Sequence, residues 1–588
     1  MTDRRLRILA WTGLALVAIA YLGRIGGFVL QDPDEGRYAE IPREMLELGD
    51  WITPRLNYVK YFEKPPLLYW LVGASYHAFG MSEWSARLAP ALAGIATIAL
   101  VHRLGLAMFG RRAALVAAAL LATTPLFFVL SQVLVIDVLL TACFTATLAT
   151  LFAAHRAERK GPWCAAAAGA VALGVLAKGL VALVVPGAIG LAFLLWQRDF
   201  ATVRAFLRPA PIAVFAVIAV PWFAAVSTRN PEFPYVFFVR EHIERFATRS
   251  VGHPEGPLYY LPIVIAGGLP WTLLVAALAV EKPGRAAARS LPRAPVRLLS
   301  LWAGGIVLFF SAASSKLPPY VLPAFPALAL LAGAWIDRAL DEPVAIRRAL
   351  ISVAWCLAAV GGVVLVGSAI GAVAAPWVGP RFDAEPPEIR ALALAAASAG
   401  VALFGAGWMV LRARSDASTG GGAAPAQLLV LVLGLGLALF GAIGGRGIAK
   451  TTRDLAIAIE REAVPADRPL VVSYRRLMQS LSFYTRGRVT MLDPHATFNE
   501  ITDSARSSAD YGEFFWSDLG RLQAEWSSGR KVFIATDRAM VPELASSLSP
   551  APRVLASDGK RVLLVNFPTP GGESARAPAA VHERATGS

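Results

Sequence analysis

Charged residues and cysteines are both scarce in this sequence. Only 16% of its 588 residues are charged, whereas soluble proteins have about a quarter. The three cysteines, Cys143, Cys164 and Cys356, lie in or at the edge of apolar runs, so they predict neither a disulfide framework nor a zinc ribbon. A Gly-rich nucleotide-binding loop is also missing, and we therefore expect no nucleotide cofactor.

Long apolar runs take up most of the chain. The residues are 56% hydrophobic and the mean hydropathy is +0.54, which excludes an ordinary soluble protein and predicts a polytopic α-helical membrane protein. A helix needs roughly 17 to 25 residues to cross the hydrocarbon layer, and we count about thirteen such segments. They are residues 8–28, 88–108, 113–131, 137–154, 163–178, 179–196, 210–226, 258–280, 298–313, 321–336, 349–375, 389–411 and 427–443.

The net charge is +15, but its distribution follows the loops between these segments. No basic face interleaved with aromatic residues occurs, so we expect no nucleic-acid partner. Basic clusters recur on alternate loops, from Arg4 and Arg5 to Arg412 and Arg414, and short cytoplasmic loops are enriched in Lys and Arg. The pattern predicts a multi-pass protein of a bacterial inner membrane, with a cytoplasmic amino terminus and a periplasmic carboxy-terminal part. The first apolar run is expected to be a retained anchor.

The chain divides into a membrane domain and a soluble domain. We assign residues 1–444 to the membrane domain, in which 29–87 form a first periplasmic loop with interfacial helices and 227–257 a second large periplasmic loop. Residues 445–567 predict a periplasmic α/β domain. Its expected strands are 469–474 and 531–536, its expected helices are 455–463, 515–527 and 542–548, and a hairpin is expected over 554–567. The composition of residues 568–588 predicts a disordered tail.

The first periplasmic loop is unusually rich in charge. Apolar residues recur from Tyr38 to Leu48 at steps of three and four, which predicts an amphipathic helix at the membrane surface. Asp32 and Asp34 lie just before it. Either could cap the helix, at about 1 kcal/mol. Two closely spaced acids exceed what a cap needs, and we favour a catalytic or ligand-contacting role for Asp34.

Three other charged positions stand out on the same side of the membrane. Asp137 lies among apolar residues at the end of a span, where an acid is costly and needs a partner or a function. Lys178 lies at the equivalent end of another span; it could bind an anionic phosphate or extend towards the headgroups. Glu63 and Lys64 precede two prolines that stiffen the backbone, so they are either a held functional pair or a solvated one.

The second large loop contains Glu241, His242 and Arg245. Glu241 and Arg245 are one helical turn apart, which suits contact with a phosphate and a carboxylate partner. Since Glu and His are ordinary zinc ligands, Glu63 and His242 could hold a divalent metal, although a lone His is more often a hydrogen-bonding residue.

These motifs resemble the family of bacterial aminoarabinose (4-amino-4-deoxy-L-arabinose) lipid A transferases, in the GT-C glycosyltransferase superfamily related to protein O-mannosyltransferases. The resemblance covers roughly residues 1–340. The matching motifs are Asp34-Glu35-Gly36-Arg37-Tyr38-Ala39-Glu40-Ile41, Tyr61-Phe62-Glu63-Lys64-Pro65, Glu241-His242, Arg245-Phe246, Leu269-Pro270-Trp271 and Ser315-Lys316-Leu317-Pro318 with Tyr320.

The resemblance implies transfer of a sugar from a polyisoprenyl-phosphate carrier to lipid A at the periplasmic face. It implies that Asp34 and Asp137 are the catalytic acids, assisted by Lys64, and that Glu63 and His242 are metal ligands for a zinc ion. The carrier phosphate and donor would be bound by Lys64, Lys178, Arg245, Tyr320, Lys316, Arg37 and Tyr61. Gly36 departs from the Thr common in the family, which leaves the sugar and the acceptor open.

Three alternatives remain at this stage. The acceptor could be a protein or another envelope glycan. A transporter would also place ionisable residues near spans, but it should have them at mid-membrane together with internal repeats, which the sequence lacks. A non-catalytic scaffold would not need so dense a first loop.

Overall fold

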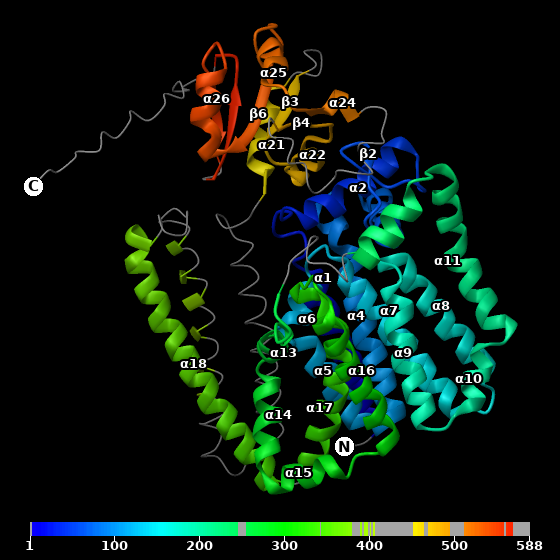
Figure 1. Ribbon diagram of the computed structural model, residues 1–588. Helices are drawn as coiled ribbons and strands as arrows, with labels where there is room; N and C mark the ends of the chain where they lie inside the picture. The colour runs from blue at the N-terminus through cyan, green and yellow to red at the C-terminus, as the bar shows by residue number, and fades with distance from the viewer. Residues whose placement is uncertain are drawn as a thin grey trace, which may run out of the picture.

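The computed structural model describes residues 3–244, 255–341, 343–378, 451–463, 469–493, 511–557 and 560–568, with scattered positions between 389 and 408. It is a helical bundle with a smaller α/β unit at one end (Figure 1). The bundle consists of α1 (Asp3–Leu22), α4 (Glu83–Phe109), α5 (Arg111–Thr123), α6 (Pro125–Leu130), α7 (Ile136–Arg156), α8 (Lys160–Lys178), α9 (Val181–Trp196), α10 (Phe200–Phe206), α11 (Pro209–Arg229), α13 (Tyr260–Gly267), α14 (Trp271–Val280), α15 (Lys282–Arg289), α16 (Arg293–Ala312), η2 (Pro318–Ala324), α17 (Phe325–Ala339) and α18 (Pro343–Val378).

The described helices include seven that are long and apolar enough to cross a membrane. The number rises to eight if α13 and α14, which bend by 97° at their junction, form one span. The predicted span 113–131 is divided, because α5 ends at Thr123 and Pro125 begins α6. The predicted spans near 389–411 and 427–443 fall mostly or wholly outside the described residues, as does the predicted tail, so the expected count of about thirteen stays a prediction.

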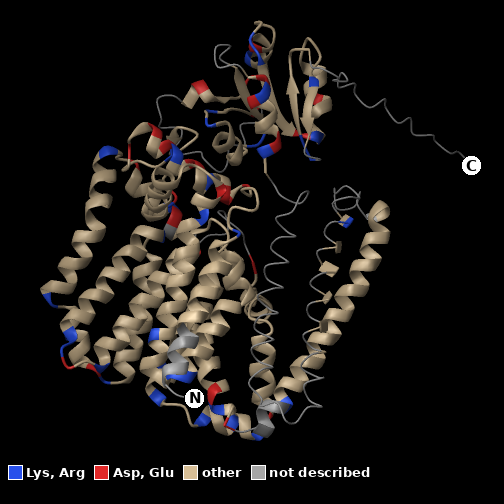
Figure 2. Ribbon diagram, turned by 180° about the vertical axis from the view of Figure 1, so that it is seen from behind, with Lys and Arg blue, Asp and Glu red and all other residues tan. Residues whose placement is uncertain are grey.

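Charge is concentrated at the two ends of the bundle. Figure 2 shows few Lys, Arg, Asp or Glu residues along the middle of the helices. One charged end contains α15, and the other faces the α/β unit. This distribution is what a bundle needs when its middle lies in hydrocarbon, because a charge there is costly.

The first loop, predicted over residues 29–87, folds into α2 (Asp34–Leu48), the hairpin strands β1 (Arg55–Leu56) and β2 (Val59–Lys60), and α3 (Leu67–Phe79). Asn57 and Tyr58 form the hairpin turn with φ of 54° and 66°, the left-handed values that a tight two-residue turn requires. In the second loop, η1 (Tyr235–Glu244) is a π-helix.

Helix α2 is more deeply buried than its amphipathic pattern predicts. Its apolar residues Ile41 and Met45 are buried as expected, but Glu40 and Glu44 on its polar side are also fully buried. The hairpin covers that side: the Tyr58 N–H donates to Glu44 Oε2 at 2.9 Å. Arg43 neutralises Glu40 through two bonds of 2.7 Å. Tertiary contacts thus replace the solvent that the sequence pattern implies.

The C-terminal unit contains a six-stranded sheet in the order β5-β4-β3-β6-β8-β7. Its strands are β3 (Leu470–Tyr474), β4 (Thr490–Leu492), β5 (Phe515–Trp516), β6 (Val532–Asp537), β7 (Arg553–Ser557) and β8 (Arg561–Val565), and its helical segments are α21 (Arg453–Glu462), α22 (Gln479–Thr485), α24 (Tyr511–Phe514), α25 (Leu519–Trp526), η5 (Arg538–Met540) and α26 (Val541–Ser547). Strands β4, β3 and β6 are parallel, and β7 and β8 form the predicted antiparallel pair. The helix predicted from Phe515 is wrong at its start, because Phe515 and Trp516 pair with β4.

Candidate active site at the end of the bundle

Asp34 is the first residue of α2, and its side chain is 56% exposed. The residue before it, Pro33, occupies the cap position, and no side chain caps the helix. Asp32 instead bonds to the C-terminal unit. The capping role considered for these two acids is therefore excluded, and Asp34 keeps an accessible carboxylate with the Arg37 guanidinium 3.9 Å away.

Arg37 joins two separate parts of the first loop. Its Nη1 donates to the Tyr61 hydroxyl at 3.0 Å and lies 3.4 Å from Glu63 Oε2. The Tyr61 hydroxyl in turn donates to Glu63 Oε2 at 2.8 Å. We call Asp34, Arg37, Tyr61 and Glu63 the Arg37 cluster. Burial raises the pKa of Tyr61 well above its ordinary value, so its hydroxyl stays a donor at neutral pH.

Lys64 continues this charged surface towards the second loop. Its ammonium lies 3.7 Å from Glu241 of η1 and donates to the Glu63 carbonyl at 3.0 Å. The two loops therefore meet at Lys64 and Glu241, a contact that the sequence does not predict. Arg245 and the side chain of His242 lie outside the described residues.

Asp137 and Lys178 are partners. Asp137 is in the first turn of α7 and Lys178 is the last residue of α8, and their side chains form a mostly buried ion pair. The Lys178 ammonium also lies 4.2 Å from the ring centroid of Tyr320, within the range of a cation–π contact. Asp137, Lys178 and Tyr320 form a second group, the Lys178 cluster. Lys178 therefore does not extend towards the headgroups. It is the partner that the buried Asp137 carboxylate needs.

A buried ion pair connects the segments that carry the two acids. Glu35 Oε1 accepts from Arg87 Nε at 2.7 Å and from the Leu134 N–H at 2.8 Å. Glu35 Oε2 accepts from Arg87 Nη2 at 2.8 Å and from the Gln31 N–H at 3.0 Å. Glu35 follows Asp34 directly, and Leu134 precedes Asp137 by three residues. One carboxylate thus ties the start of α2 to the start of α7.

Apolar packing connects the same regions. Phe62, beside Glu63, shares a buried cluster with Leu176, two residues before Lys178, and with Phe233 and Phe237 of the second loop. The rings of Phe62 and Phe233 meet edge to face at 5.3 Å. The Arg37 and Lys178 clusters are therefore held by one apolar core.

Lys316 has a different environment from the one predicted. It is 4% exposed, and its ammonium donates to the backbone carbonyls of Ala313 at 2.5 Å and Glu255 at 2.9 Å. These bonds make it a connector between α16 and the end of the second loop, not a member of either cluster.

The described residues do not make up a metal site. Within the parts of the chain that the structure describes, no three His, Cys, Asp or Glu side chains could hold one ion together. Glu63 Oε2 also lies 3.4 Å from the Arg37 guanidinium, whose positive charge disfavours a second cation there.

Tyr69 was missed as a candidate because an aromatic residue at the start of an apolar helix usually belongs to the core. It is fully buried on α3, and its hydroxyl has no hydrogen-bond partner among the residues that the structure describes. Burial, with Glu63 nearby, raises its pKa. A buried hydroxyl without a partner is unusual and needs an explanation; here it is a donor available beside the Arg37 cluster.

The two clusters and Lys64 supply three cations and an accessible acid. Each of Arg37, Lys64 and Lys178 could bind a phosphate oxygen by a charge-assisted hydrogen bond. Asp34 is exposed and could accept a proton or orient a hydroxyl. Such a set suits group transfer from a phosphate-linked donor.

Comparisons with known proteins agree with this arrangement. Residues 63–227 match the model of the dolichyl-phosphate-mannose-protein mannosyltransferase family. The crystal structure of ArnT from Cupriavidus metallidurans bound to undecaprenyl phosphate is similar to this chain, with 30% sequence identity and a TM-score of 0.81. The match covers 95% of this chain and 98% of the ArnT chain.

Two curated relatives are undecaprenyl phosphate-alpha-4-amino-4-deoxy-L-arabinose arabinosyl transferases. The protein of Pectobacterium carotovorum subsp. carotovorum is 38% identical over 55% of this chain, and this match spans 58% of the relative's length. The protein of Edwardsiella ictaluri is 34% identical over 68% of this chain and 72% of the relative. The apolar helices and this similarity make the chain a multi-pass protein of a bacterial inner membrane. The chain belongs to the family of undecaprenyl phosphate-alpha-4-amino-4-deoxy-L-arabinose arabinosyl transferases.

Proposed function

We propose that this protein is a lipid-linked-sugar-dependent glycosyltransferase. It moves 4-amino-4-deoxy-L-arabinose or a similar sugar from a polyisoprenyl-phosphate donor to lipid A. The observation that carries the proposal is the exposed Asp34 carboxylate beside Arg37, with Lys64 and Lys178 on neighbouring elements. The names of the two curated relatives support the same donor and reaction.

The reaction breaks the bond between the anomeric carbon and a carrier-phosphate oxygen, and forms a bond from that carbon to an acceptor oxygen. The bonding electrons leave with the carrier phosphate, so its negative charge grows. Arg37, Lys64 and Lys178 stabilise that charge as it develops. Asp34 orients the acceptor oxygen and takes up its proton, or only orients it when the acceptor is already an ionised phosphate.

The proposal includes the membrane topology. The amino terminus is cytoplasmic, and the active site and the C-terminal α/β domain (445–567) are periplasmic. The end of the bundle that contains α15 would then face the cytoplasm, in line with the basic residues from Lys282 to Arg297.

A zinc ion held by Glu63 and His242 stays a separate prediction. Metal analysis of the purified protein and of its Glu63→Gln variant tests it. A wild-type preparation without stoichiometric metal would contradict it.

The match to protein mannosyltransferases favours one second candidate, in which the acceptor is a protein or another envelope glycan. Mass spectrometry of lipid A, envelope glycans and membrane proteins distinguishes the two acceptors. Cells with the wild-type chain, without it, and with Asp34→Asn should be compared, with the exposed Asp454→Asn as the matched control. We expect the added sugar on lipid A only with the wild type and the control. A modified lipid A in cells that contain only Asp34→Asn would remove Asp34 from the reaction.

A further inference from the structure

The C-terminal unit lies directly on the first loop (Figure 1). Helix α22 packs against α2 so closely that a Cβ on Gly36 would lie 2.5 Å from the Ser480 backbone nitrogen. Phe483 of α22 and Met491 of β4 belong to the same apolar core as Tyr76 of α3. The C-terminal unit therefore packs directly against the first loop.

The first polar contact is made by Asp32. This residue is 8% exposed, and Ser480 donates to its carboxylate from both the backbone N–H and the hydroxyl, each at 2.7 Å. Arg561 of β8 donates to the same carboxylate at 3.3 Å. Asp34, with its exposed carboxylate, follows two residues later.

Asp32 lies beside the sheet of the C-terminal unit, at the position where such sheets bind ligands. In open α/β sheets, ligands bind outside the carboxyl ends of the strands, where the strand order reverses. The parallel strands here reverse between β3 and β6. Ser480 follows β3, and Arg561 pairs with Asp537 at the end of β6. The ligand position of this sheet is thus taken by a side chain of the membrane domain.

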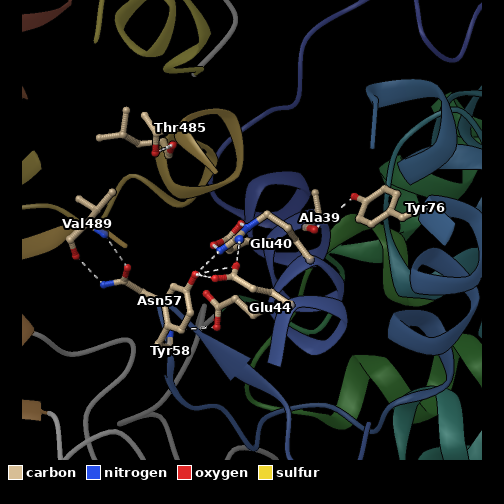
Figure 3. A network of polar contacts seen from close by, with 11 residues as sticks. Ala39, Glu40, Glu44, Asn57, Tyr58, Tyr76, Thr485 and Val489 are labelled. Atoms are coloured by element: carbon tan, nitrogen blue, oxygen red, sulfur yellow. Dashed lines mark hydrogen bonds and ion pairs between the residues drawn. The ribbon is translucent and has the colours of Figure 1, made fainter. Parts of the chain in front are cut away.

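The second contact is made by Asn57 at the tip of the hairpin. Its Nδ2 donates to the Val489 carbonyl at 2.7 Å, and its Oδ1 accepts from the Val489 N–H at 3.0 Å. Figure 3 shows the Asn57 amide facing the Val489 backbone, with Tyr58, Glu40 and Glu44 beside it. Strand β2 leads from this tip to Tyr61 and Glu63 within a few residues.

A third contact is made by Tyr484 of α22. The Tyr484 hydroxyl accepts from the Leu30 N–H at 2.9 Å and donates to Glu83 at 3.2 Å. The C-terminal unit therefore holds the chain before α2, the hairpin before Glu63, and the start of α4.

We propose that the C-terminal unit is a positioning domain for the first loop. The ligand position of its sheet holds the segment around Asp32, which we call the Asp32 arm. The backbone of Val489 holds the tip of the hairpin at Asn57, which we call the Asn57 arm. Arg37 on the first arm and Tyr61 with Glu63 on the second can meet only when both arms are held. The unit contributes no group to the reaction. The effect on catalysis rests on the proposed function; the effect on the geometry of the loop does not.

The test uses the full-length protein in lipid nanodiscs. Asn57→Gly removes the amide but keeps the left-handed turn, Asn57→Asp keeps one of the two bonds, and Asp32→Asn weakens the other arm. Glu525→Gln on α25 is the control. Turnover with a polyisoprenyl-phosphate sugar and hydrogen exchange are measured for each variant.

We expect kcat to fall about 10- to 100-fold in Asn57→Gly and Asp32→Asn, because misplacement by about 1 Å costs that much. KM for the donor should change little, and Asn57→Asp should lie between Asn57→Gly and the wild type. Exchange should rise in residues 34–48 and 59–64 and stay unchanged in α7.

Wild-type turnover in the Asn57→Gly/Asp32→Asn double variant, or unchanged exchange in its first loop, would overturn the proposal. If the double variant does not fold, Asn57→Asp decides by the same two measurements. If the wild type itself transfers no sugar, the proposed function fails, and the exchange measurements still decide whether the unit holds the loop.

Discussion

Charged side chains in this protein are paired across elements, and the pairing separates structural from chemical roles. Asp137 and Lys178 neutralise each other in a largely buried setting. Asp34 keeps more than half of its side chain accessible. A substitution at a paired residue therefore has two effects, one on stability and one on activity.

Lys178→Met should leave the Asp137 carboxylate buried without its partner. Breaking a buried pair in this way costs about 3–5 kcal/mol, and we expect a lower thermal midpoint in detergent. Adding Asp137→Asn should restore most of the stability because no unpaired charge remains. Sugar transfer should be lost in both variants. A double variant with normal turnover would show that the pair is only structural.

Glu44 should make stability depend on pH. Burial and the neighbouring Glu40 raise its pKa well above 4.5, so the folded protein binds a proton there that the unfolded chain releases. Its contribution to stability is complete below pH 4.5 and is lost as the pH rises through the folded pKa. The side chain introduced by Glu44→Gln cannot ionise. The thermal midpoint of this variant should therefore be higher than that of the wild type at pH 8. It should also decrease less than the wild-type midpoint between pH 5 and pH 8. Glu47→Gln, on the exposed side of α2, is the control. Equal slopes for the wild type and Glu44→Gln would refute this account.

At the scale of elements, hydropathy predicted the positions of the apolar helices, and local signals predicted β3, β6 and the β7–β8 hairpin. The sequence could not predict which helices exchange charges, because Asp137 and Lys178 are 41 residues apart. Nor could it predict that Glu40 and Glu44, on the polar side of α2, are buried. The burial of α2 depends on contacts with the Tyr58 N–H and with α22, and the helical periodicity of the sequence carries no information about either contact. The motif residues Asp34, Arg37, Tyr61 and Glu63 could be found from the family resemblance, whereas the burial that singles out Tyr69 is visible only in the structure.

The ion pair between Glu35 and Arg87 should control how α2 and α7 are placed. Arg87→Met leaves Glu35 buried without its cation, at a cost of about 3–5 kcal/mol. We expect a lower thermal midpoint and, because Asp34 and Asp137 lose their shared support, a larger loss in kcat than in donor affinity. Arg111→Met, at the exposed start of α5, is a matched control. Wild-type kcat in a folded Arg87→Met protein would contradict this role.

At the scale of the whole molecule, the two charged ends of the bundle should lie on opposite sides of the membrane. Ser290 follows α15, and Ser546 lies on α26 of the C-terminal unit; both are exposed. In a Cys356→Ser background, we expect an impermeant thiol reagent to label Ser546→Cys in spheroplasts and Ser290→Cys only after the membrane is broken. The buried Cys143 and Cys164 should stay unlabelled. The reverse pattern would invert the proposed topology.

The bond between Asp32 and Ser480 spans 448 residues of sequence. During synthesis, the early loop emerges long before the partner that fixes it. A nascent or prematurely terminated polypeptide therefore contains its full set of reactive side chains without the geometry that aligns them. The assembly can be completed only after the C-terminal unit has been synthesised, so the order of translation delays the alignment of these side chains.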